Sequence, residues 1–389
     1  MAINLLLGIT GTVCLLVLLY LVILAIASLL PEKRIHSHSP RSKFCIVIPA
    51  HDEAENIGTT LDILKMVNYP EHLYDIIVIA DNCHDHTTTE VHKRKIKWME
   101  RKNDRITNKG IALKWAFSHL IKSTTHDAFV VIDADTHMDP NFLTIMNNCL
   151  SSGQKVIQGY SQVRNPQRSL LESLSFLGFA LNRNLKYRGR SRLKLCPILM
   201  GTGMCIAREV IEQFGWPACS LVEDVEFTMF LKIHGINVFF AEKARLTVEL
   251  HTDILSTKRQ RLRWDLGKLE IKKRYLRSLI HHAFLYKDIS CLDCAMELLL
   301  PPFPILFVII TGGGVLSIIA KWANICSPAV LSVWLSNTSL IILYTIAGLI
   351  SAKAPPKVYK ALLYAPLIVM WRSWIVLRES FNKNRNTRW

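Results

Sequence analysis

The stretch of sequence that decides the fold is AFVVIDAD, residues 128–135. Apolar and partly β-branched residues lead directly into two acidic residues, and residues 136–140 then interrupt the run. This pattern predicts a buried β-strand that ends in a loop. Because alternate residues of an extended chain point the same way, we expect Asp133 and Asp135 to face one point.

These two acidic residues predict a site for a divalent cation. Two carboxylates that face one point repel each other unless a cation lies between them. Oxygen ligands favour Mg²⁺ or Mn²⁺, which commonly also hold substrate phosphates. An Asp-x-Asp triplet alone also suits a solvated loop with two unrelated acids, so the interpretation depends on the rest of the chain.

Two other apolar runs of strand length, residues 44–48 and 76–80, precede this stretch. Helical patterns at residues 56–66 and 110–121 lie between the three expected strands. Strands that alternate with helices predict an α/β fold with a mostly parallel central sheet and helices on both faces. Ligands of such sheets bind beyond the carboxyl ends of the strands.

Acidic residues follow each of the three expected strands. They are Asp52 and Glu53, Asp81 and Asp85, and Asp133 and Asp135. Acids at three strand ends favour a ligand site over a chance arrangement, because these ends meet at one edge of a parallel sheet.

A lysine and a second acidic pair are further candidates for this site. Lys109 and Gly110 begin an expected helix, where a diphosphate would find a positive charge and free backbone N–H groups. A solvated lysine at an ordinary helix start is the alternative. Glu223 and Asp224 begin another expected helix. They could simply interact with the positive end of the helix dipole, or one of them could serve as a general base close to the metal site.

The composition indicates membrane segments. Of the 389 residues, 50% are hydrophobic, and the mean hydropathy is +0.23. Residues 5–30 carry no charge and follow no lysine or arginine, so we expect an N-terminal anchor over residues 1–31 and not a cleaved signal peptide. Apolar runs at 296–320 and 329–350 predict two more spans within residues 291–352.

The remaining expectations for the membrane concern orientation and surface helices. The net charge is +16, and basic residues after the anchor predict a multi-pass protein of the cell (inner) membrane whose active site faces the cytoplasm. Residues 257–290 predict an amphipathic interfacial region. The pattern of residues 169–187 is typical of either an interfacial helix on the membrane surface or a buried helix that supports the fold. Within residues 353–389, the sequence suits an interfacial or a short membrane helix and then a basic tail. Nucleic acid is not an expected partner, because the positive charge lies beside apolar stripes.

The motifs, taken in order, resemble those of the membrane-bound branch of the family 2 inverting glycosyltransferases, which includes cellulose, hyaluronan and poly-N-acetylglucosamine synthases. The resemblance covers about residues 43–267. It rests on Pro-x-His-Asp-Glu at 49–53, Asp81, Lys109-Gly110, Asp-x-Asp at 133–135, Glu223-Asp224 and Gln-Arg-x-Arg-Trp at 260–264. It implies a GT-A nucleotide-sugar-binding domain, which we expect over residues 32–267.

The resemblance also implies a role for each motif. Asp224 matches the catalytic base of the family's Thr-Glu-Asp motif, in which Val222 replaces the threonine, and Glu223 is the second catalytic candidate. Asp133 and Asp135 match the triplet that binds Mg²⁺ or Mn²⁺. The residues that match nucleotide-sugar-binding positions are Pro49, His51, Glu53, Asp81, Lys109, Asp133, Gln260, Arg261, Arg263 and Trp264. The family often has asparagine at the position of Asp52. Trp264 suits either an interfacial anchor or a stacking surface for a sugar.

The expected function is transfer of a sugar from a UDP-sugar to a lipid-linked or polysaccharide acceptor, with inversion to a β-linkage, in the synthesis of exopolysaccharide or cell-surface glycan. One alternative is the addition of a single sugar to ceramide, diacylglycerol or polyprenyl phosphate. The few expected transmembrane helices favour it, because they provide few helices to enclose a polysaccharide channel. The alternative from another class is a non-catalytic membrane nucleotide-binding module. The sequence does not indicate whether the protein binds partner subunits.

Overall fold

The computed structural model describes residues 2–32, 34–103, 108–249 and 254–364, and it divides into two compact units. The sheet unit comprises residues 32–164 and 194–298, and the helical unit comprises residues 1–31, 165–193 and the chain from residue 299. Residues 165–193 lie inside the expected 32–267 domain but cluster with the apolar helices.

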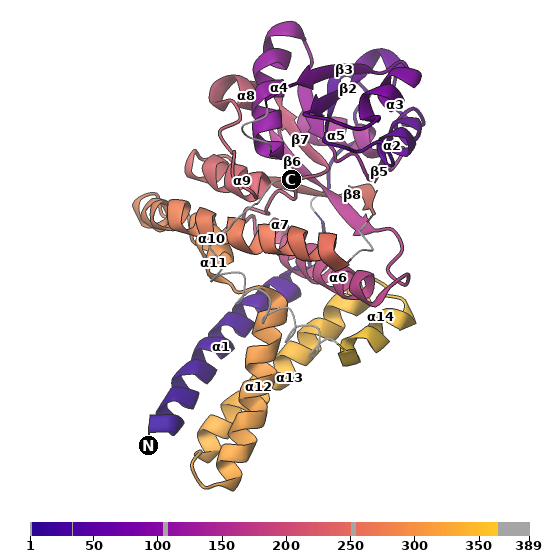
Figure 1. The fold of residues 1–389 in the computed structure, drawn as a ribbon. Coiled ribbons are helices and arrows are strands. Elements are labelled where there is room, and N and C mark those ends of the chain that lie inside the picture. Colours follow the sequence, from indigo (N-terminus) through magenta and orange to yellow (C-terminus); the bar gives the residue numbers. More distant parts are fainter. Residues whose placement is uncertain (1, 33, 104–107, 250–253, 365–389) are drawn as a thin grey trace. The chain divides into compact units, whose positions relative to one another are not determined.

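A mixed sheet forms the centre of the sheet unit (Figure 1). It has eight strands in the order β3-β2-β1-β4-β7-β6-β8-β5. Its strands are β1 (Phe44–Ala50), β2 (Tyr74–Asp81), β3 (Lys97–Arg101), β4 (Ala128–Val131), β5 (Thr136–Met138), β6 (Val156–Val163), β7 (Met204–Ala207) and β8 (Phe239–Val248). The pairs β1–β2, β2–β3, β1–β4 and β6–β8 are parallel, and β4–β7, β6–β7 and β5–β8 are antiparallel. The predicted mostly parallel α/β sheet is confirmed.

The register of β1 brings the three predicted strand ends together. All seven residues of β1 are buried, as expected for a strand between two parallel neighbours. Ala50 pairs with Ala80 of β2, and Val47 pairs with Val131 of β4. The segments that follow β1, β2 and β4 therefore leave the sheet at one edge.

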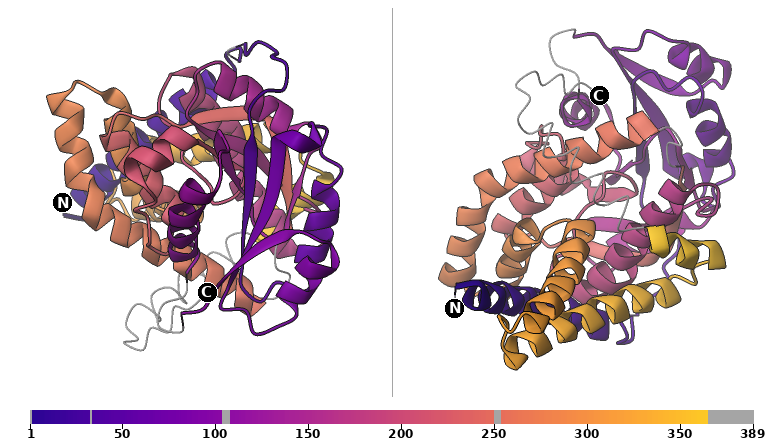
Figure 2. Two further views of the ribbon diagram at one scale, coloured as in Figure 1. Left: turned by 90° about the horizontal axis from the view of Figure 1, so that it is seen from above. Right: turned by 60° about the horizontal axis from the view of Figure 1, so that its bottom comes forward.

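Helices lie on either side of the strands (Figure 2). The helices of the sheet unit are α2 (Ile57–Leu64), α3 (Thr87–Lys93), α4 (Lys109–Ser123), α5 (Phe142–Ser151), α8 (Arg208–Phe214), α9 (Glu223–Ile233), α10 (Ile254–Leu285) and α11 (Ile289–Leu299). Helix α4 begins where the Asn108 side chain accepts a hydrogen bond from the Ile111 N–H at 2.8 Å, a standard N-cap. Phe117 of α4 packs edge-on against Phe129 of β4, with ring centroids 5.3 Å apart. This contact joins α4 to the strand that leads to Asp133.

Within its described residues, the helical unit contains three helices that are long and apolar enough to cross a membrane. They are α1 (Ala2–Ala27), α12 (Phe303–Trp322) and α13 (Pro328–Ser351). The unit also contains α6 (Leu170–Ala180), the π-helix η2 (Leu181–Tyr187), α7 (Arg188–Arg192) and α14 (Pro356–Ala361). Trp334 of α13 donates from Nε1 to the Leu7 carbonyl of α1 at 3.0 Å, and Asn337 donates to the Gly11 carbonyl at 2.8 Å. Interhelical hydrogen bonds of this kind hold apolar helices together.

Two sequence-based boundaries differ from the structure. The span expected at 296–320 begins only at Phe303, because Pro301 and Pro302 separate it from α11. The amphipathic region expected at 257–290 corresponds to most of α10, which ends at Leu285, and to the start of α11 at Ile289. Most of residues 353–389, including the possible fourth membrane segment, lies outside the described residues.

Candidate active site

The end of β2 forms a buried acidic position at the edge of the sheet. Pro49 lies within β1 opposite Ile79, and His51 directly follows β1. His51 places Nδ1 2.7 Å from the backbone oxygen of Asp81. The Asp81 side chain is fully buried and forms an ion pair with Arg101 through Oδ1. Its Oδ2 is buried and has no hydrogen-bond partner in the described part of the chain. Burial raises the pKa of the Asp81 carboxyl, although Arg101 favours its charged form.

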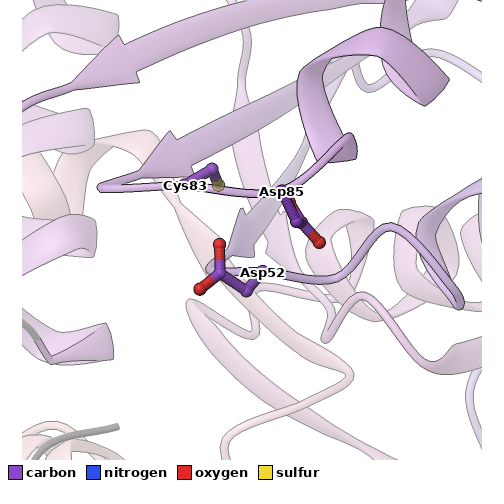
Figure 3. A group of neighbouring side chains, drawn as sticks. All are labelled: Asp52, Cys83 and Asp85. Carbon is purple, nitrogen blue, oxygen red and sulfur yellow. The ribbon is translucent and has the colours of Figure 1, made fainter.

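The acids beside this position hold two loops together (Figure 3). Asp52, which has a positive φ of 54°, accepts a hydrogen bond from the His84 N–H at 2.7 Å. Asp85 accepts from the Ala54 N–H and from the Thr87 N–H, each at 2.9 Å. These carboxylates and the Cys83 thiol lie close enough together to hold a metal ion. Because the hydrogen bonds to the loops account for both carboxylates, we assign Asp52 and Asp85 to loop structure.

Lys109, the first residue of α4, lies among the other predicted acids. Its ammonium group forms an ion pair with Asp133 and donates to the Gly201 carbonyl at 2.6 Å. Its Nζ also lies 3.6 Å from Oε1 of Glu223. Burial alone would lower the pKa of Lys109, but the negative charges of Asp133, Glu223 and Asp224 raise it above the ordinary value. Lys109 therefore remains positively charged in this acidic surrounding.

Glu223 and Asp224, the first two residues of α9, approach Lys109 from the other side. Gly201 has a φ of +74°, and a Cβ added there would lie 3.3 Å from Lys109 Nζ and 3.4 Å from Asp224 Oδ2. A side chain at residue 201 would therefore crowd both Lys109 and Asp224. Burial, with the neighbouring Glu223 charge, raises the pKa of Asp224 to about 7. Burial also raises the pKa of Glu223, whereas Lys109 favours its charged form.

Asp133 and Asp135 follow β4, and they face different surroundings. The Asp133 N–H donates to Oγ1 of Thr202 at 3.1 Å, while its carboxylate pairs with Lys109. Burial, together with the negative charges of Asp133 and Glu53, raises the pKa of Asp135 to about 7. The negative charges of Asp133 and Glu53 thus disfavour the ionised form of Asp135, and proton uptake relieves this repulsion. A divalent cation would relieve the same repulsion, and carboxylate oxygens are ligands that suit Mg²⁺ or Mn²⁺.

The predicted Gln-Arg-x-Arg-Trp motif lies in α10. The Arg263 charge favours the ionised form of Glu223, which places this arginine near the acidic pair. The Trp264 side chain is 41% exposed. The side chains of Gln260 and Arg261 lie outside the described part of the chain.

Sequence reasoning missed several residues that complete the site. The sequence around Arg101 does not indicate its ion pair with Asp81, because this pair depends on the register of β2 and β3. The Gly-Thr-Gly run at 201–203 suits any tight turn, and the structure shows that the Gly201 carbonyl accepts from Lys109 and that Oγ1 of Thr202 accepts from the Asp133 N–H.

A family model described as glycosyltransferase like family 2 matches residues 40–267. The probable glycosyltransferase YdaM of Bacillus subtilis (strain 168) is 26% identical over 240 residues, which are 60% of this chain and 57% of that protein. A poly-β-1,6-N-acetyl-D-glucosamine synthase of Staphylococcus epidermidis is 22% identical over 240 residues, which are 61% of this chain and 57% of that protein. The chain thus spans about half the length of the curated relatives it matches.

Among solved structures, a mannosyltransferase from Pyrobaculum calidifontis in complex with GDP-Man and Mn²⁺ matches with a TM-score of 0.58 and 15% sequence identity. The match covers 90% of this chain and 97% of that chain, and it shows a shared GT-A fold. The family model covers more than half of the chain and includes every sheet strand described above. The chain therefore belongs to the family 2 glycosyltransferases and is a transferase with the GT-A fold.

Proposed function

We propose that this transferase moves a sugar from a UDP-sugar to a lipid-linked or glycan acceptor at a membrane surface, with inversion at the anomeric carbon. The observation that carries the proposal is the position of Lys109, which contacts Asp133 on one side and lies near Glu223 and Asp224 on the other. This arrangement brings a positive charge for a diphosphate and a carboxylate base into one site.

The unpartnered Oδ2 of Asp81 supports a nucleotide base as the ligand at the β2 end. A buried carboxylate oxygen without a donor is costly, and a ligand N–H would satisfy it. The N3–H of uracil is such a donor, and the resemblance assigns Pro49, His51 and Glu53 to the same uridine. A guanine N–H would also fit, so a panel of donors has to include GDP-sugars.

Asp133 and Asp135 would hold the divalent cation. Bound Mg²⁺ or Mn²⁺ would take up negative charge on the leaving diphosphate. Lys109 contributes a second positive charge on the side of α4. We place Gln260, Arg261, Arg263 and Trp264 at the mouth of the site, where a diphosphate and an acceptor enter.

Asp224 would act as the general base. It takes the proton of the acceptor hydroxyl while the hydroxyl oxygen bonds to the anomeric carbon, and the bond from that carbon to the diphosphate oxygen breaks. The nucleoside diphosphate leaves, and the sugar ends with inverted configuration. A single displacement needs no covalent intermediate, so one base suffices, and Glu223 would hold Lys109 in position.

A membrane surface suits this enzyme because the sheet unit carries a basic and apolar surface at the turn between α10 and α11. Phe284, Tyr286 and Ile289 are 76%, 67% and 71% exposed. Lysines and arginines precede this turn on α10, and three residues connect α11 to the apolar helix α12. We propose that the turn rests on the cytoplasmic leaflet of the cell membrane, with acceptors supplied from the lipid.

Release of the nucleoside diphosphate tests the function. Purified protein in lipid vesicles with Mn²⁺ or Mg²⁺ is incubated with UDP- and GDP-sugars, and we expect UDP release that depends on the cation and on an added lipid or glycan acceptor. Product length separates chain elongation from a single addition. Tight UDP binding without release or transfer for any donor would instead support the nucleotide-binding module.

A further inference from the structure

The loop of residues 218–222 lies between the start of α4 and the start of α9. A Cβ added at Gly110 would lie 2.6 Å from the Ala218 oxygen and 3.0 Å from both the Cys219 Cα and the Glu223 Cβ. The first turn of α4 is therefore in direct backbone contact with this loop. No side chain larger than hydrogen fits at residue 110 unless the loop moves.

Two polar side chains, the buried Glu226 and the partly buried Asn108, bind the backbone around Cys219. Glu226 of α9 is 1% exposed, and its Oε2 accepts the N–H groups of Cys219 at 3.0 Å and Ser220 at 2.8 Å. The side-chain amide of Asn108 donates to the Cys219 carbonyl at 2.9 Å. We call these contacts the Cys219 clamp.

The clamp lies between the two halves of the proposed site. Asn108 directly precedes Lys109, and Glu226 lies in the same first turn of α9 as Asp224. The other oxygen of Glu226 forms an ion pair with Arg274 of α10. A continuous series of contacts thus runs from α10 through Glu226 and Cys219 to the residue beside Lys109.

We propose that Asn108 and Glu226 are positioning residues, which set the distance from Lys109 to Asp224 through the Cys219 clamp, and that Arg274 holds Glu226 in place. The inference rests on the proposed function of this site. Both oxygens of Glu226 are occupied by loop N–H groups and Arg274, so Glu226 acts through the loop and not on the reacting atoms. A displacement of about 1 Å between catalytic groups can reduce a rate by about 100-fold.

Two substitutions of Asn108 separate the clamp from the helix cap. Asn108→Ser keeps a side-chain oxygen that can cap α4, but it removes the amide that reaches Cys219. Asn108→Asp also keeps the cap, but it places a carboxylate against the Cys219 carbonyl. We expect both variants to reduce kcat, by about 10-fold to 100-fold, while the donor KM changes by less than about 3-fold.

Glu226→Gln and Arg274→Gln test the other side of the clamp. We expect the same pattern of lower kcat with a nearly unchanged donor KM. The matched control is Arg94→Gln, which removes an arginine that directly follows α3 and pairs with Asp62 of α2 at 3.0 Å and with Glu90 of α3 at 2.8 Å. The control should lose ion pairs of the same kind without a change in kcat.

Hydrogen exchange measures the clamp without any activity. In Glu226→Gln, we expect the amides of Cys219 and Ser220 to exchange at least about 10-fold faster than in the wild type, and in Arg94→Gln to exchange at the wild-type rate. Absence of sugar transfer by the wild type would reject the proposed function, whereas unchanged exchange in Glu226→Gln would reject the clamp itself. Wild-type kcat in both Asn108→Ser and Glu226→Gln would overturn the positioning role, as would a fall in kcat of the same size in Arg94→Gln.

Discussion

Lys109 Nζ lies 3.6 Å from Glu223 Oε1 while it forms an ion pair with Asp133. One buried ammonium group thus joins the segment after β4 to the first turn of α9. The carboxylates around it would repel one another without this charge. The same lysine therefore has a structural role and a proposed role in binding the diphosphate.

Replacement of Lys109 by methionine should destabilise the protein strongly. The change leaves the buried carboxylate of Glu223 and the partly exposed carboxylate of Asp133 without their cation, and a buried polar group that loses its partner costs about 1–3 kcal/mol. Thermal unfolding of the detergent-solubilised protein measures the effect. Lys97→Met is the control, because its ion pair with Asp75 is exposed and contributes at most about 1 kcal/mol. Equal shifts in the two variants would contradict a special role for Lys109.

Asp224→Asn should reduce sugar transfer by about 100-fold to 10,000-fold, because a positioned general base contributes a factor of this size. The amide is nearly isosteric, so UDP binding should remain close to that of the wild type. Calorimetry of UDP binding and a transfer assay measure the two properties. Asp62→Asn, which alters an exposed acid paired with Arg94, is the control. Full turnover in Asp224→Asn would refute the assignment of the base.

The pH dependence of transfer should reflect the raised pKa of Asp224. Burial and the Glu223 charge raise this pKa to about 7, and only the ionised carboxylate can accept a proton. We therefore expect kcat/KM to fall with decreasing pH, by about tenfold for each unit well below pH 7, and to level off above it. A profile that is flat from about pH 5 to pH 8 would contradict this expectation.

Divalent-cation binding should also weaken as pH falls. Burial and the charges of Asp133 and Glu53 raise the pKa of Asp135 to about 7, above the ~3.9 of an unfolded chain. Folding without a cation therefore favours the protonated form, and this contribution to stability is lost as pH rises through about 7. A bound cation requires the ionised form. We expect Mn²⁺ to raise the melting temperature more at about pH 8 than at about pH 5.5.

Asp135→Asn provides the control for this measurement, because it removes the titrating group and one ligand oxygen. The Mn²⁺-induced shift should become small and independent of pH. An undiminished shift in this variant would place the cation elsewhere.

The turn between α10 and α11 should contact lipid. A fluorescent probe on a cysteine introduced at Leu285, which is 60% exposed, should be quenched by brominated lipids when the full chain is in vesicles. The same probe at Met66, which is 65% exposed, should remain accessible to an aqueous quencher. Shielding at residue 285 without lipid quenching would indicate contact with a second copy instead.

The sequence by itself determined the three strand ends, the acids that follow them and the three apolar helices. These features are local, because a short apolar run predicts a strand and a long uncharged run predicts a span. The order of the motifs then identified the family. The role of Asp52 and Asp85 could not be predicted, because hydrogen bonds between two loops from different parts of the chain decide it.

Only the tertiary structure decided which acids lie around Lys109 and how the loop before α9 is held. The contacts of Lys109 with Gly201 and Glu223, and those of Glu226 with Cys219 and Arg274, join residues far apart in the sequence. Periodicity carries no information on such pairs, because they depend on strand order and helix packing. The assignment of residues 165–193 to the helical unit has the same origin, since a helical pattern does not reveal its packing partner.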